Sequence, residues 1–503
     1  MHTCCIRTEI GDPPATGQRS IDMKSPIIFW YRQDLRIDDL PGLAAAAATG
    51  QPIIPCYILD DETPGTWRTG AASRWWLHHS LDALATDLAE LGATLVLRRG
   101  ETQAALQQLL EDTGARDIYC SRMYEPWAAD LEARLHSHFE ANDVEFKRYG
   151  GTLLREPETV SNLSGLPYKV FTPFWRSCLA REEPAPPQRL TKTACWWEDT
   201  ISSDALARWA LCPQQPDWAS QWAHWWSPGS AGAGLKLEGF LQDGVSNYGE
   251  GRDHPALDCT ARLSPHLHFG EISPREVWHR VRYATAQQAQ LDSQAEKFLS
   301  QIGWREFSYH LMHHFPEIPE QAFKAPFRDF PWLSDDARLQ AWQSGQTGYP
   351  MVDAGMRELW HTGYMHNRVR MIVASFLTKH LLIHWQEGAK WFWDTLLDAD
   401  LANNSCGWQW VAGSGADASP YFRIFNPIVQ GQKFDAEGSY IRRWVPEIAA
   451  LPNRYLNCPW DAPASVLQEA GVILGRDYPH PIVDHKIARE GALAALASLG
   501  ERS

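Results

Sequence analysis

Single β-rich runs alternate with single helical runs over residues 26–150, and this alternation constrains the fold more than any other feature of the sequence. Short runs rich in β-branched and aromatic residues stand at 27–31, 53–59, 94–97, 118–120 and 144–149. Helical patterns separate them at 43–48, 72–91, 102–111 and 127–139. One helix between successive strands predicts a parallel, doubly wound sheet, which binds ligands at the carboxyl ends of its strands.

The first of these strand ends reads FWYRQDLRIDD (29–39). No GxGxxG or Walker sequence follows it. We therefore expect neither an ordinary dinucleotide site nor an ordinary nucleoside triphosphate site there.

From Leu235 onward, apolar residues recur at the helical period instead. The clearest stripes lie at 296–314, 337–344, 351–361, 366–384 and 389–401. Ser273-Pro274 and Asp335-Asp336 are typical helix starts. Because sustained alternation at period two is absent, this half is predicted to be an all-α domain.

The region between the two halves is rich in proline and in polar segments interrupted by Trp196, Trp197 and Trp222. This composition predicts a long surface connection with only short helices. The predicted fold is α/β plus all-α. We expect a loose N-terminal extension at 1–25, a Rossmann-like doubly wound domain at 26–150, a linker at 151–225 and a helical domain at 226–503.

Composition narrows the class of protein. A hydrophobic content of 44% over 503 residues indicates a globular chain. The net charge of −15 excludes a generic basic coat for nucleic acid, although not a local basic groove. The 10 cysteines form no CxxC pair, which is typical of reduced thiols in a cytoplasmic protein. No apolar run is long enough to span a membrane, and the N-terminus has no apolar signal core.

The stretch 398–427, DADLANNSCGWQWVAGSGADASPYFRIFNP, carries the most unusual local pattern. Asp398 and Asp400 are two residues apart, so they cannot share one face of a regular helix. Trp408, Trp410 and Arg423 follow. Irregular backbone with polar and aromatic side chains suits a ligand pocket, but a buried, tryptophan-rich core turn fits the residues equally well.

The histidine groups favour packing over metal binding. His310, His313 and His314 have a spacing that could bind a metal, but no nearby carboxylate or cysteine completes the set. We interpret them, and His266 with His268, as packed or surface residues and predict no metal site. No Ser/His/Asp set follows a nucleophile-elbow sequence, so hydrolase chemistry has no support.

Basic residues gather in the helical half. The window 357–380 contains a single acid, Glu358, and its cations are followed by others soon after. The basic set is Arg357, Arg368, Arg370, Lys379, Arg423, Lys433, Arg442 and Arg443. The aromatic residues interleaved with it are Trp360, Trp385, Trp408, Trp410, Tyr421 and Phe422. Cations beside flat side chains are typical of nucleic-acid binding, and a solvated helix face is the alternative.

Seven blocks of this sequence, in order and spacing, resemble the photolyase/cryptochrome family. They are IIFWYRQDLRIDD, TARLSPHLHFGEISP, WREF, GYPMVDAGMREL, GYMHNRVRM, DADLANNSCGWQW and YFRIFNP. The resemblance covers about residues 26–490 and is nearest to the bacterial DNA photolyases that act on cyclobutane pyrimidine dimers, through ANN…GWQW and YFRIFNP.

The resemblance implies an α/β domain that can hold an antenna chromophore, a long linker and an all-α domain that binds FAD. The enzyme flips a pyrimidine dimer out of UV-damaged DNA into a cavity over the flavin. Excited, fully reduced flavin then donates an electron to the dimer, the cyclobutane ring opens and the electron returns. The resemblance also suggests a monomer.

The family pattern assigns roles by position. Around FAD it places Tyr248, Arg252, Thr260, Arg262, Leu263, Ser264, Arg305, Asn367, Arg370, Asp398, the backbone of Ala399, Asp400 and Asn404. Within this set, Arg370 should pair with Asp398, both acids should border the isoalloxazine, and Asn404 should face flavin N5. Trp304 and Trp410 should flank the dimer and Met371 should touch its bases. Arg368 and Arg423 are expected DNA contacts.

The family's electron chain corresponds to Trp408, Trp385 and Trp332. This chain would carry an electron from the surface to photo-oxidised flavin. Core packing is the alternative role for each of these residues, and the sequence alone does not separate the two.

The chain departs from the family pattern at Gln301, three residues before Trp304, where dimer-type enzymes carry Glu. An amide can donate a hydrogen bond to the lesion but cannot share a proton as a carboxylic acid can. Gln also occurs in the (6-4) branch, which has two adjacent histidines where this chain has His366-Asn367. Because the histidine pair is absent, we keep the cyclobutane-dimer prediction, with a (6-4) photolyase and a cryptochrome photoreceptor as alternatives. A second departure is Tyr364, which stands where relatives often carry Trp.

The antenna pattern is also distinct. Folate-binding relatives carry an Asn-Glu pair after the fourth strand, where this chain has YEPWAAD (124–130). A deazaflavin-type second chromophore is therefore favoured over folate, and an empty or different pocket is the alternative.

Overall fold

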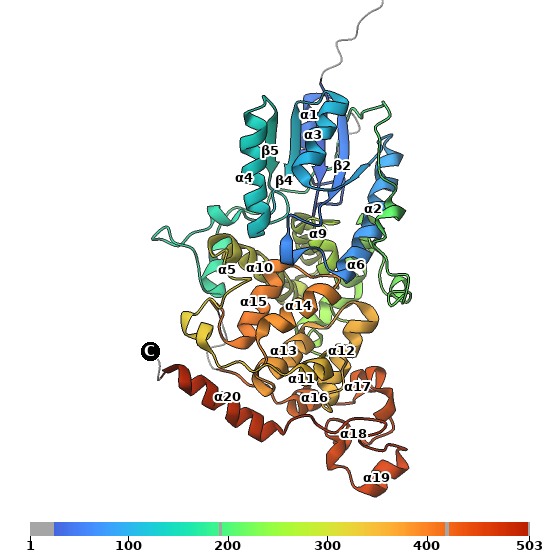
Figure 1. Ribbon diagram of the computed structural model, residues 1–503, viewed down its shortest axis with the longest axis vertical. Helices are drawn as coiled ribbons and strands as arrows, with labels where there is room; N and C mark the ends of the chain where they lie inside the picture. The colour runs from blue at the N-terminus through green and yellow to red at the C-terminus, as the bar shows by residue number, and fades with distance from the viewer. Residues whose placement is uncertain (1–24, 191–193, 418–421, 501–503) are drawn as a thin grey trace, which may run out of the picture.

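The computed structural model describes residues 25–190, 194–417 and 422–500. The α/β domain lies above the helical domain in Figure 1, and the C-terminal helix runs along the lower edge of the latter. All of the expected N-terminal extension except Ser25 lies outside the described residues.

The N-terminal domain contains the predicted parallel sheet. Its strands are β1 (Ile27–Tyr31), β2 (Ile53–Leu59), β3 (Val96–Arg99), β4 (Asp117–Ser121) and β5 (Glu145–Tyr149), in the order β3-β2-β1-β4-β5. In the register, Ile28 lies beside Ile54 on one side and Ile118 on the other. The third strand was expected at 94–97. It begins later because residues 56–59 of β2 pair with 96–99.

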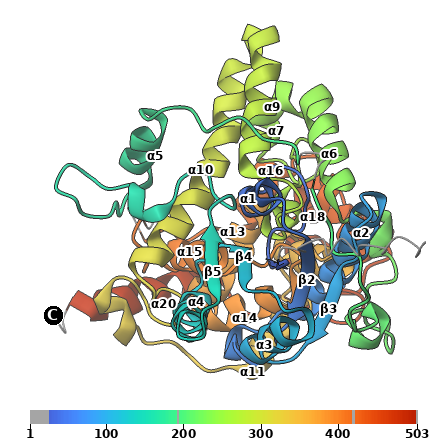
Figure 2. The ribbon, with the colours of Figure 1, turned by 90° about the horizontal axis from the view of Figure 1, so that it is seen from above.

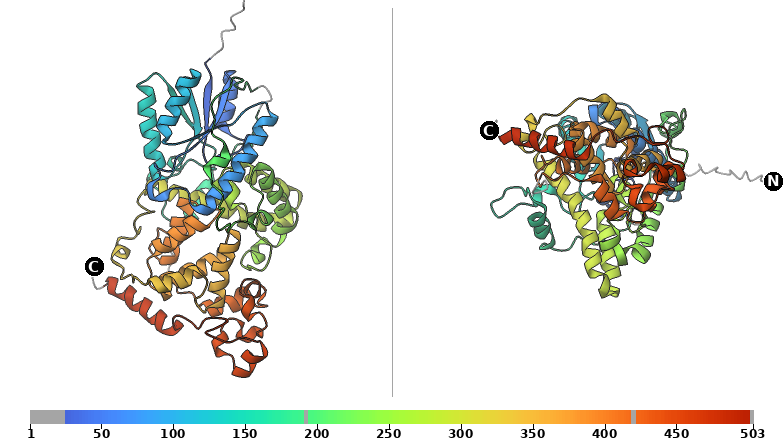
Figure 3. Two further views of the ribbon diagram at one scale, coloured as in Figure 1. Left: turned by 45° about the vertical axis from the view of Figure 1, so that its right-hand side comes forward. Right: turned by 90° about the horizontal axis from the view of Figure 1, so that it is seen from below.

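Helices cover both faces of this sheet (Figure 3). The four helices are α1 (Pro41–Thr49), α2 (Ala71–Glu90), α3 (Thr102–Thr113) and α4 (Pro126–Glu140). Successive side chains of a strand point to opposite faces. Phe29 accordingly packs in the cluster that contains Trp76 of α2, whereas Ile28 packs with Leu109 of α3 and Leu135 of α4. The predicted doubly wound fold is confirmed.

The connection contains one short helix, α5 (Phe171–Leu179), and several single turns, as predicted. Its tryptophans pack against the α/β domain. Trp196 forms an isolated parallel bridge with Ile53 at the start of β2. Trp209 and Trp222 are buried in the core cluster of the α/β domain. The aromatic residues of the connection thus hold it against the α/β domain by packing.

The described part of the second half contains helices and isolated bridges but no strand. Its first helices are α6 (Ser230–Gly239), α7 (Tyr248–Gly251), α8 (Ser264–His268), α9 (Pro274–Gln287), α10 (Asp292–His314), α11 (Asp336–Gln343) and α12 (Pro350–Thr362). The rest are α13 (Asn367–Ser375), α14 (Trp385–Thr395), α15 (Leu401–Ala412), α16 (Pro427–Phe434), α17 (Ser439–Trp444), α18 (Asn453–Leu456), α19 (Ala464–Glu469) and α20 (His485–Gly500). Ser273 and Asp335 cap α9 and α11 as predicted.

Two predicted helices are wrong in their bounds. The stripe at 366–384 is α13 followed by a π-turn at Phe376–His380, and Leu382 then takes a left-handed backbone with φ 50°. His384 caps the start of α14 instead of ending the preceding helix. The stripe at 389–401 is also broken, because α14 ends at Thr395 and α15 begins at Leu401. Apolar periodicity runs through both breaks, so it does not reveal them.

A buried lysine caps the C-terminal end of α15 by a hydrogen bond. Lys379 is only 1% exposed, and its Nζ donates to the carbonyl oxygen of Ala412 at 2.7 Å. It also lies over the Phe422 ring, and Lys324 donates to the neighbouring Gly413 carbonyl at 3.3 Å. Burial lowers the pKa of Lys379 to about 6.

This burial predicts a stability that depends on pH. Between pH 6 and roughly 10 an unfolded lysine is protonated while Lys379 in the folded protein is not. The unfolded state therefore binds more protons, and the free energy of unfolding should rise with pH across this window. Denaturant titrations at several pH values should show a flatter profile for Lys379→Met than for the original protein. Lys324→Met, at the same helix end, should keep the original slope, and an unchanged slope in Lys379→Met would contradict the prediction.

Candidate functional site

The break between α14 and α15 brings the two spaced acids into one buried region. Asp400 is the N-cap of α15, where its carboxylate accepts a hydrogen bond from the Asn403 backbone N–H at 2.8 Å. Asp398 lies two residues earlier in the non-helical turn. Their exposed fractions are 5% and 8%. The irregular backbone inferred from their spacing is present, although it spans only the residues before Leu401.

Asp398 pairs with Arg370 of α13, as the family pattern suggested. Nη2 of Arg370 lies 3.0 and 2.9 Å from the two carboxylate oxygens. The guanidinium Nε donates to the Met365 carbonyl, and the group lies 5.2 Å from the Tyr364 ring centre. The pair fixes the Asp398 carboxylate in position within the helical core.

Asp400 has a different set of partners, which the sequence did not reveal. It accepts hydrogen bonds from the Tyr309 hydroxyl of α10 and from the Asn403 amide, and His268 Nδ1 of α8 lies 3.4 Å away. Burial by itself would raise the pKa of Asp400, but the contact with His268 and the charge of Arg305 hold it well below its ordinary value. Asp400 therefore stays ionised as a fixed negative charge in the core.

Several cations surround two tyrosines beside this acid pair. Arg252 lies over Tyr248 at 5.3 Å, and Arg262 lies over Tyr364 at 5.8 Å. Arg262 has a left-handed backbone with φ 48°, which costs energy for a non-glycine residue. The buried Nε atoms of Arg262 and Arg368 have no hydrogen-bond partner among the described residues. These donors are available to an anionic group of a ligand.

The other residues expected around FAD lie on the elements that border this cluster. Thr260 and Leu263 precede α8, and Ser264 is its first residue; Asn367 is the first residue of α13. Arg305 of α10 donates to the carbonyl oxygens of Thr152 and Leu267. Their roles toward a cofactor remain predictions.

Asn404 links the two helices that flank the break. Its amide Nδ2 donates to the Ala389 carbonyl oxygen of α14 at 2.9 Å. The side chain is half-buried. The contact fixes the orientation of Asn404, and its expected approach to flavin N5 remains a prediction.

One face of α10 forms an aromatic and polar wall. Trp304 stacks on Phe171 of α5, with ring centres 3.8 Å apart and planes 10° apart. Gln301 lies one turn earlier and accepts a hydrogen bond from Arg252 Nη2 at 3.0 Å. Its amide nitrogen donates to the Lys297 carbonyl and the Ser300 hydroxyl. Arg252 therefore sets the orientation of the residue at which the chain departs from the family.

Trp410 and Met371, the other residues expected to contact the dimer, lie on α15 and α13. Helix α15 packs against α10 and carries the half-buried Trp410. Met371 of α13 is half-buried, and its sulfur lies 3.8 Å from Arg368 Nη1. Arg423 is exposed next to Phe425. Tyr421, part of the same sequence block, lies outside the described residues.

The three tryptophans of the expected electron chain lie in or beside one core cluster. His384 lies between two of them, with its ring centre 5.1 Å from Trp332 and 5.6 Å from Trp385. Trp408 contacts Phe392 at 5.1 Å. Gly388 allows this packing, because an added Cβ would come within 2.0 Å of the Trp408 ring. Their positions suit both core packing and electron transfer, so the electron-transfer role remains a prediction.

The cations of the basic window at 357–380 are mostly paired with acids or buried, so the window as a whole is not an exposed nucleic-acid face. Arg357 pairs with Glu447 at 2.7 Å, and Arg368 pairs with Asp253 at 2.8 Å. Arg370 is held by Asp398, and Lys379 is buried. Sequence charge density does not distinguish a surface patch from buried ion pairs. The exposed members of the wider basic set are Arg423, Lys433 and Arg443.

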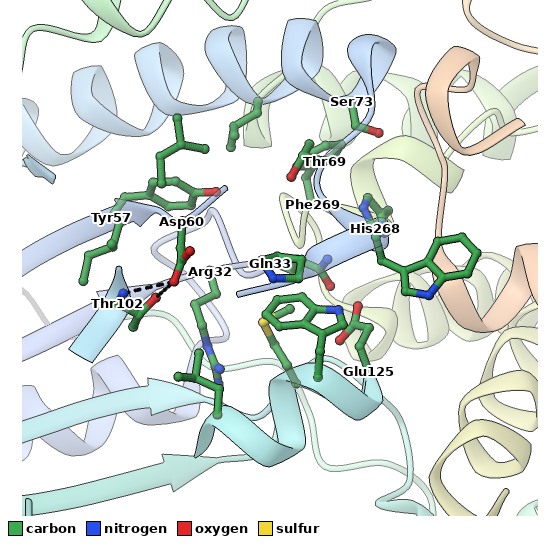
Figure 4. A pocket seen from close by; sticks show the side chains of 18 of the residues that line it. Arg32, Gln33, Tyr57, Asp60, Thr69, Ser73, Thr102, Glu125, His268 and Phe269 are labelled. Carbon is green, nitrogen blue, oxygen red and sulfur yellow. Dashed lines mark hydrogen bonds between the residues drawn. The ribbon is translucent and has the colours of Figure 1, made fainter. Parts of the chain in front are cut away.

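A second pocket lies at the carboxyl ends of β1, β2 and β4 (Figure 4). It encloses roughly 890 Å³, including its open mouth. Flat side chains line it, among them Trp30, Trp67, Trp127 and Trp393. The polar lining includes Arg32, which pairs with the buried Glu132, and Asp60, which accepts a hydrogen bond from Thr102. The end of the first strand, singled out as a ligand position, thus borders a pocket.

This pocket also reaches the acid-bearing turn, because Ala399 and His268 belong to its lining. The strand-end pocket and the cluster around Asp398 and Asp400 are therefore neighbours along this segment.

Of the histidines considered as metal ligands, His266, His268 and His310 are buried, His314 is half-buried and His313 is exposed. His266 hydrogen-bonds Glu271 in full burial, and His310 accepts a hydrogen bond from the Tyr168 backbone N–H. Burial lowers the pKa of His310 to about 4, so it is neutral near pH 7. Within the described ranges, no group of three or more His, Cys, Asp or Glu residues could hold a metal ion.

Comparison with known proteins identifies the family. The family model for the FAD binding domain of DNA photolyase matches residues 298–498, and the DNA photolyase model matches 27–191. The chain is 48% identical over 479 residues to the deoxyribodipyrimidine photo-lyase of Agrobacterium fabrum, covering 94% of this chain and 98% of that protein. This chain belongs to the photolyase/cryptochrome family.

Solved and curated members of the family agree with this assignment. A bacterial class III photolyase from Agrobacterium tumefaciens has a TM-score of 0.92 and 46% identity, covering 96% of this chain and 100% of that one. Cryptochrome-2 of Arabidopsis thaliana is 38% identical over 95% of this chain and 80% of its own length. An archaeal photolyase from Sulfolobus tokodaii, solved with two FAD molecules, has a TM-score of 0.77 and 28% identity, with 94% and 100% coverage.

The helical half of this family member is therefore an FAD-binding domain, and its residues fit that cofactor. The unpartnered Nε atom of Arg262 can serve the pyrophosphate. The Arg370–Asp398 pair and the charged Asp400 are buried polar groups of the kind that orient a ring with several hydrogen-bonding edges.

Proposed function

We propose that this protein is a light-dependent DNA repair lyase that splits cyclobutane pyrimidine dimers. The observation that carries the proposal is the wall formed by Trp304, stacked on Phe171, and by Gln301, held by Arg252. A flat ring next to a hydrogen-bonding amide suits an extrahelical lesion that consists of two joined neighbouring bases. The wall lies on α10, which also contributes Arg305 and Tyr309 to the cluster around Asp400.

Each residue of the proposed lesion site has a separate role that follows from its position. FAD, when bound in reduced form and excited by light, supplies the electron that opens the cyclobutane ring. Trp304 and Trp410 hold the dimer by stacking, and Met371 contacts its bases. Gln301 donates its amide to the dimer once that amide releases the Lys297 carbonyl or the Ser300 hydroxyl. Arg368 and Arg423 contact the DNA backbone, which fixes the register of the lesion over its cavity.

The decisive experiment uses reduced, flavin-loaded protein and an oligonucleotide with a single cyclobutane dimer. Blue light should restore the two pyrimidines, and the dark control should not. Cryptochrome relatives make a flavin photoreceptor the second candidate. Flavin that responds to light without splitting any dimer would support that candidate. The same assay with a (6-4) lesion tests the alternative raised by Gln301.

Gln301→Glu should increase dimer splitting. One carboxylate oxygen would remain paired with Arg252. The second cannot donate to the Lys297 carbonyl as the amide does, so it would turn toward the lesion and accept a charge-assisted hydrogen bond from it. We expect the rate under limiting light to rise by roughly threefold to tenfold, a gain of about 1 kcal/mol. Gln290→Glu, an exposed change before α10, is the matched control. An unchanged or lower rate would show that the amide is not a handicap.

We also propose a second, light-harvesting chromophore in the pocket at the strand ends. Its tryptophan lining and its place at the strand ends suit a flat ligand. A second cofactor in this role is named for the Sulfolobus tokodaii structure. A deazaflavin-type molecule remains the favoured choice over folate. The absorption spectrum of the purified protein separates them, because each adds its own band beyond those of flavin.

The remaining properties are proposals of the same kind. We expect a monomer that acts on UV-damaged DNA in the cytoplasm. The eight cysteines of the described residues are all free. Within those residues no helix combines the length and the apolar character needed to cross a membrane.

A further inference from the structure

A second, smaller cavity adjoins the strand-end pocket. It encloses roughly 290 Å³, including its open mouth. Arg305 and Tyr309 of α10 belong to its lining, and both also surround Asp400. The residues that line both cavities are Arg32, Gln33, Met123, Glu125 and His268. The smaller cavity therefore joins the lining of the strand-end pocket to the partners of the buried acid.

The residues that line both cavities come from both domains. Figures 1 and 2, from the side and from above, show the α/β domain lying over α14 and α15. Glu125 immediately precedes α4 of the α/β domain, whereas His268 is the last residue of α8 in the helical domain. Figure 4 shows these two side chains on the side of the strand-end pocket away from Asp60 and Thr102. The contact between the domains therefore includes a buried acid and a buried imidazole.

Glu125 responds to charges on both sides of this contact. It is 2% exposed and accepts a hydrogen bond from the Tyr124 backbone N–H at 3.2 Å. Although it precedes α4, its side chain does not cap that helix. Burial, followed by the charge of Asp400, raises the pKa of Glu125, and the charge of His268 counteracts part of that rise. The carboxyl group is therefore placed to pair with a donor in the pocket.

His268 faces the second acid through a long contact. Its Nδ1 lies 3.4 Å from Oδ2 of Asp400, whereas hydrogen bonds from nitrogen to oxygen usually measure about 2.7–3.2 Å. Against the effect of burial, this contact does most to lower the pKa of Asp400. The imidazole therefore has room to move closer to the acid and to strengthen an interaction that is already the main one.

We propose that His268 is a positioning residue that couples the strand-end pocket to the flavin site, an inference that rests on the light-harvesting chromophore proposed for that pocket. With Glu125 unpaired, the imidazole is divided between the two acids. A ligand donor that pairs with Glu125 releases His268, whose Nδ1 then moves closer to Asp400. The negative charge next to the flavin is partly neutralised as a result.

This coupling favours the reduced form of bound FAD. An electron adds more readily beside a weaker negative charge, so the midpoint potential rises when the pocket ligand is present. Because coupling between two sites is reciprocal, the same ligand binds more tightly to protein with reduced flavin. The protein thus reaches its reduced, repair-competent form more easily once the light-harvesting chromophore is in place.

The test measures the midpoint potential of bound FAD in the dark, by equilibration with a dye of known potential after removal of any second chromophore. Glu125→Gln imitates a paired acid. It should raise the ratio of reduced to oxidised flavin at a fixed dye potential by at least roughly threefold. His268→Gln removes the donor at the Nδ1 position and should lower this ratio to a similar extent. Glu111→Gln, an exposed change on α3, is the matched control and should equal the original protein.

Two further variants test whether His268 carries the effect. His268→Asn keeps an amide N–H close to the position of Nδ1, so it should restore most of the ratio lost in His268→Gln. An asparagine is too short to reach both acids, so Glu125→Gln should cause less than about half of its rise when combined with His268→Asn. An equal rise in both backgrounds would assign the effect to charge alone and overturn the coupling, and so would an unchanged ratio in Glu125→Gln.

Dimer splitting plays no part in this titration, so the coupling and the proposed repair activity fail separately. A protein that splits dimers but shows no shift in potential for Glu125→Gln loses the coupling alone. A protein that shows the expected shifts but splits no dimer keeps the coupling and loses the proposed repair activity. The absorption spectrum decides the second chromophore independently of both.

Discussion

Arg370→Met should yield a protein that has lost most of its FAD. The change leaves Asp398 buried without the cation that now holds both of its oxygens. Breaking a buried pair by removing one partner costs about 3 kcal/mol or more, equivalent to a loss of at least roughly a hundredfold in cofactor affinity. The ratio of flavin absorbance to protein absorbance after purification measures the effect.

A double change separates the pair from general damage. Arg370→Met combined with Asp398→Asn removes the uncompensated charge and should recover part of the flavin content. Arg443→Met, which removes an exposed arginine of α17, should retain full flavin. Stoichiometric flavin in Arg370→Met would show that the pair does not support the cofactor site.

Trp408→Phe should slow the light-driven reduction of oxidised FAD by more than roughly tenfold. Phenylalanine fills nearly the same space but is far harder to oxidise, so the first step of an electron chain through this position would fail. The bleaching of the oxidised flavin band under blue light, with an external reductant, gives the rate. Because chemically reduced protein bypasses the chain, its dimer splitting should remain within about twofold of the original.

The control for this change is another buried tryptophan. Trp278→Phe on α9 removes an indole from a separate core cluster and should leave photoreduction unchanged. Equal slowing in both variants would assign the effect to packing. Normal photoreduction in Trp408→Phe would remove this residue from the chain.

The architecture was largely predictable because periodicity reports directly on local structure. The alternation in 26–150 predicted the parallel sheet, and the helical stripes predicted the second half. The predictions failed where periodicity continues through a break, as at 396–400. Whether a helix ends there depends on tertiary partners such as the Arg370 guanidinium and the Tyr309 hydroxyl.

The candidate site was likewise predictable from the sequence only in part. The pairing of Arg370 with Asp398 was expected from the family pattern and is present. The partners of Asp400, namely Tyr309 and His268, carried no signal, since both stand in ordinary helical contexts. The basic window was misinterpreted because a linear count of charges does not show which are neutralised inside the fold.

The sequence by itself determined the order of strands and helices, the family and the residue types at its functional positions, because each of these depends on local spacing along the chain. The tertiary structure alone decided which groups meet. It paired Gln301 with Arg252 and stacked Phe171 on Trp304. It also joined the segment before α5 to α10 through the hydrogen bond from Tyr168 to His310. These contacts join residues 49 to 142 positions apart. Such distances carry no local periodicity, so packing of the folded chain is the only thing that sets them.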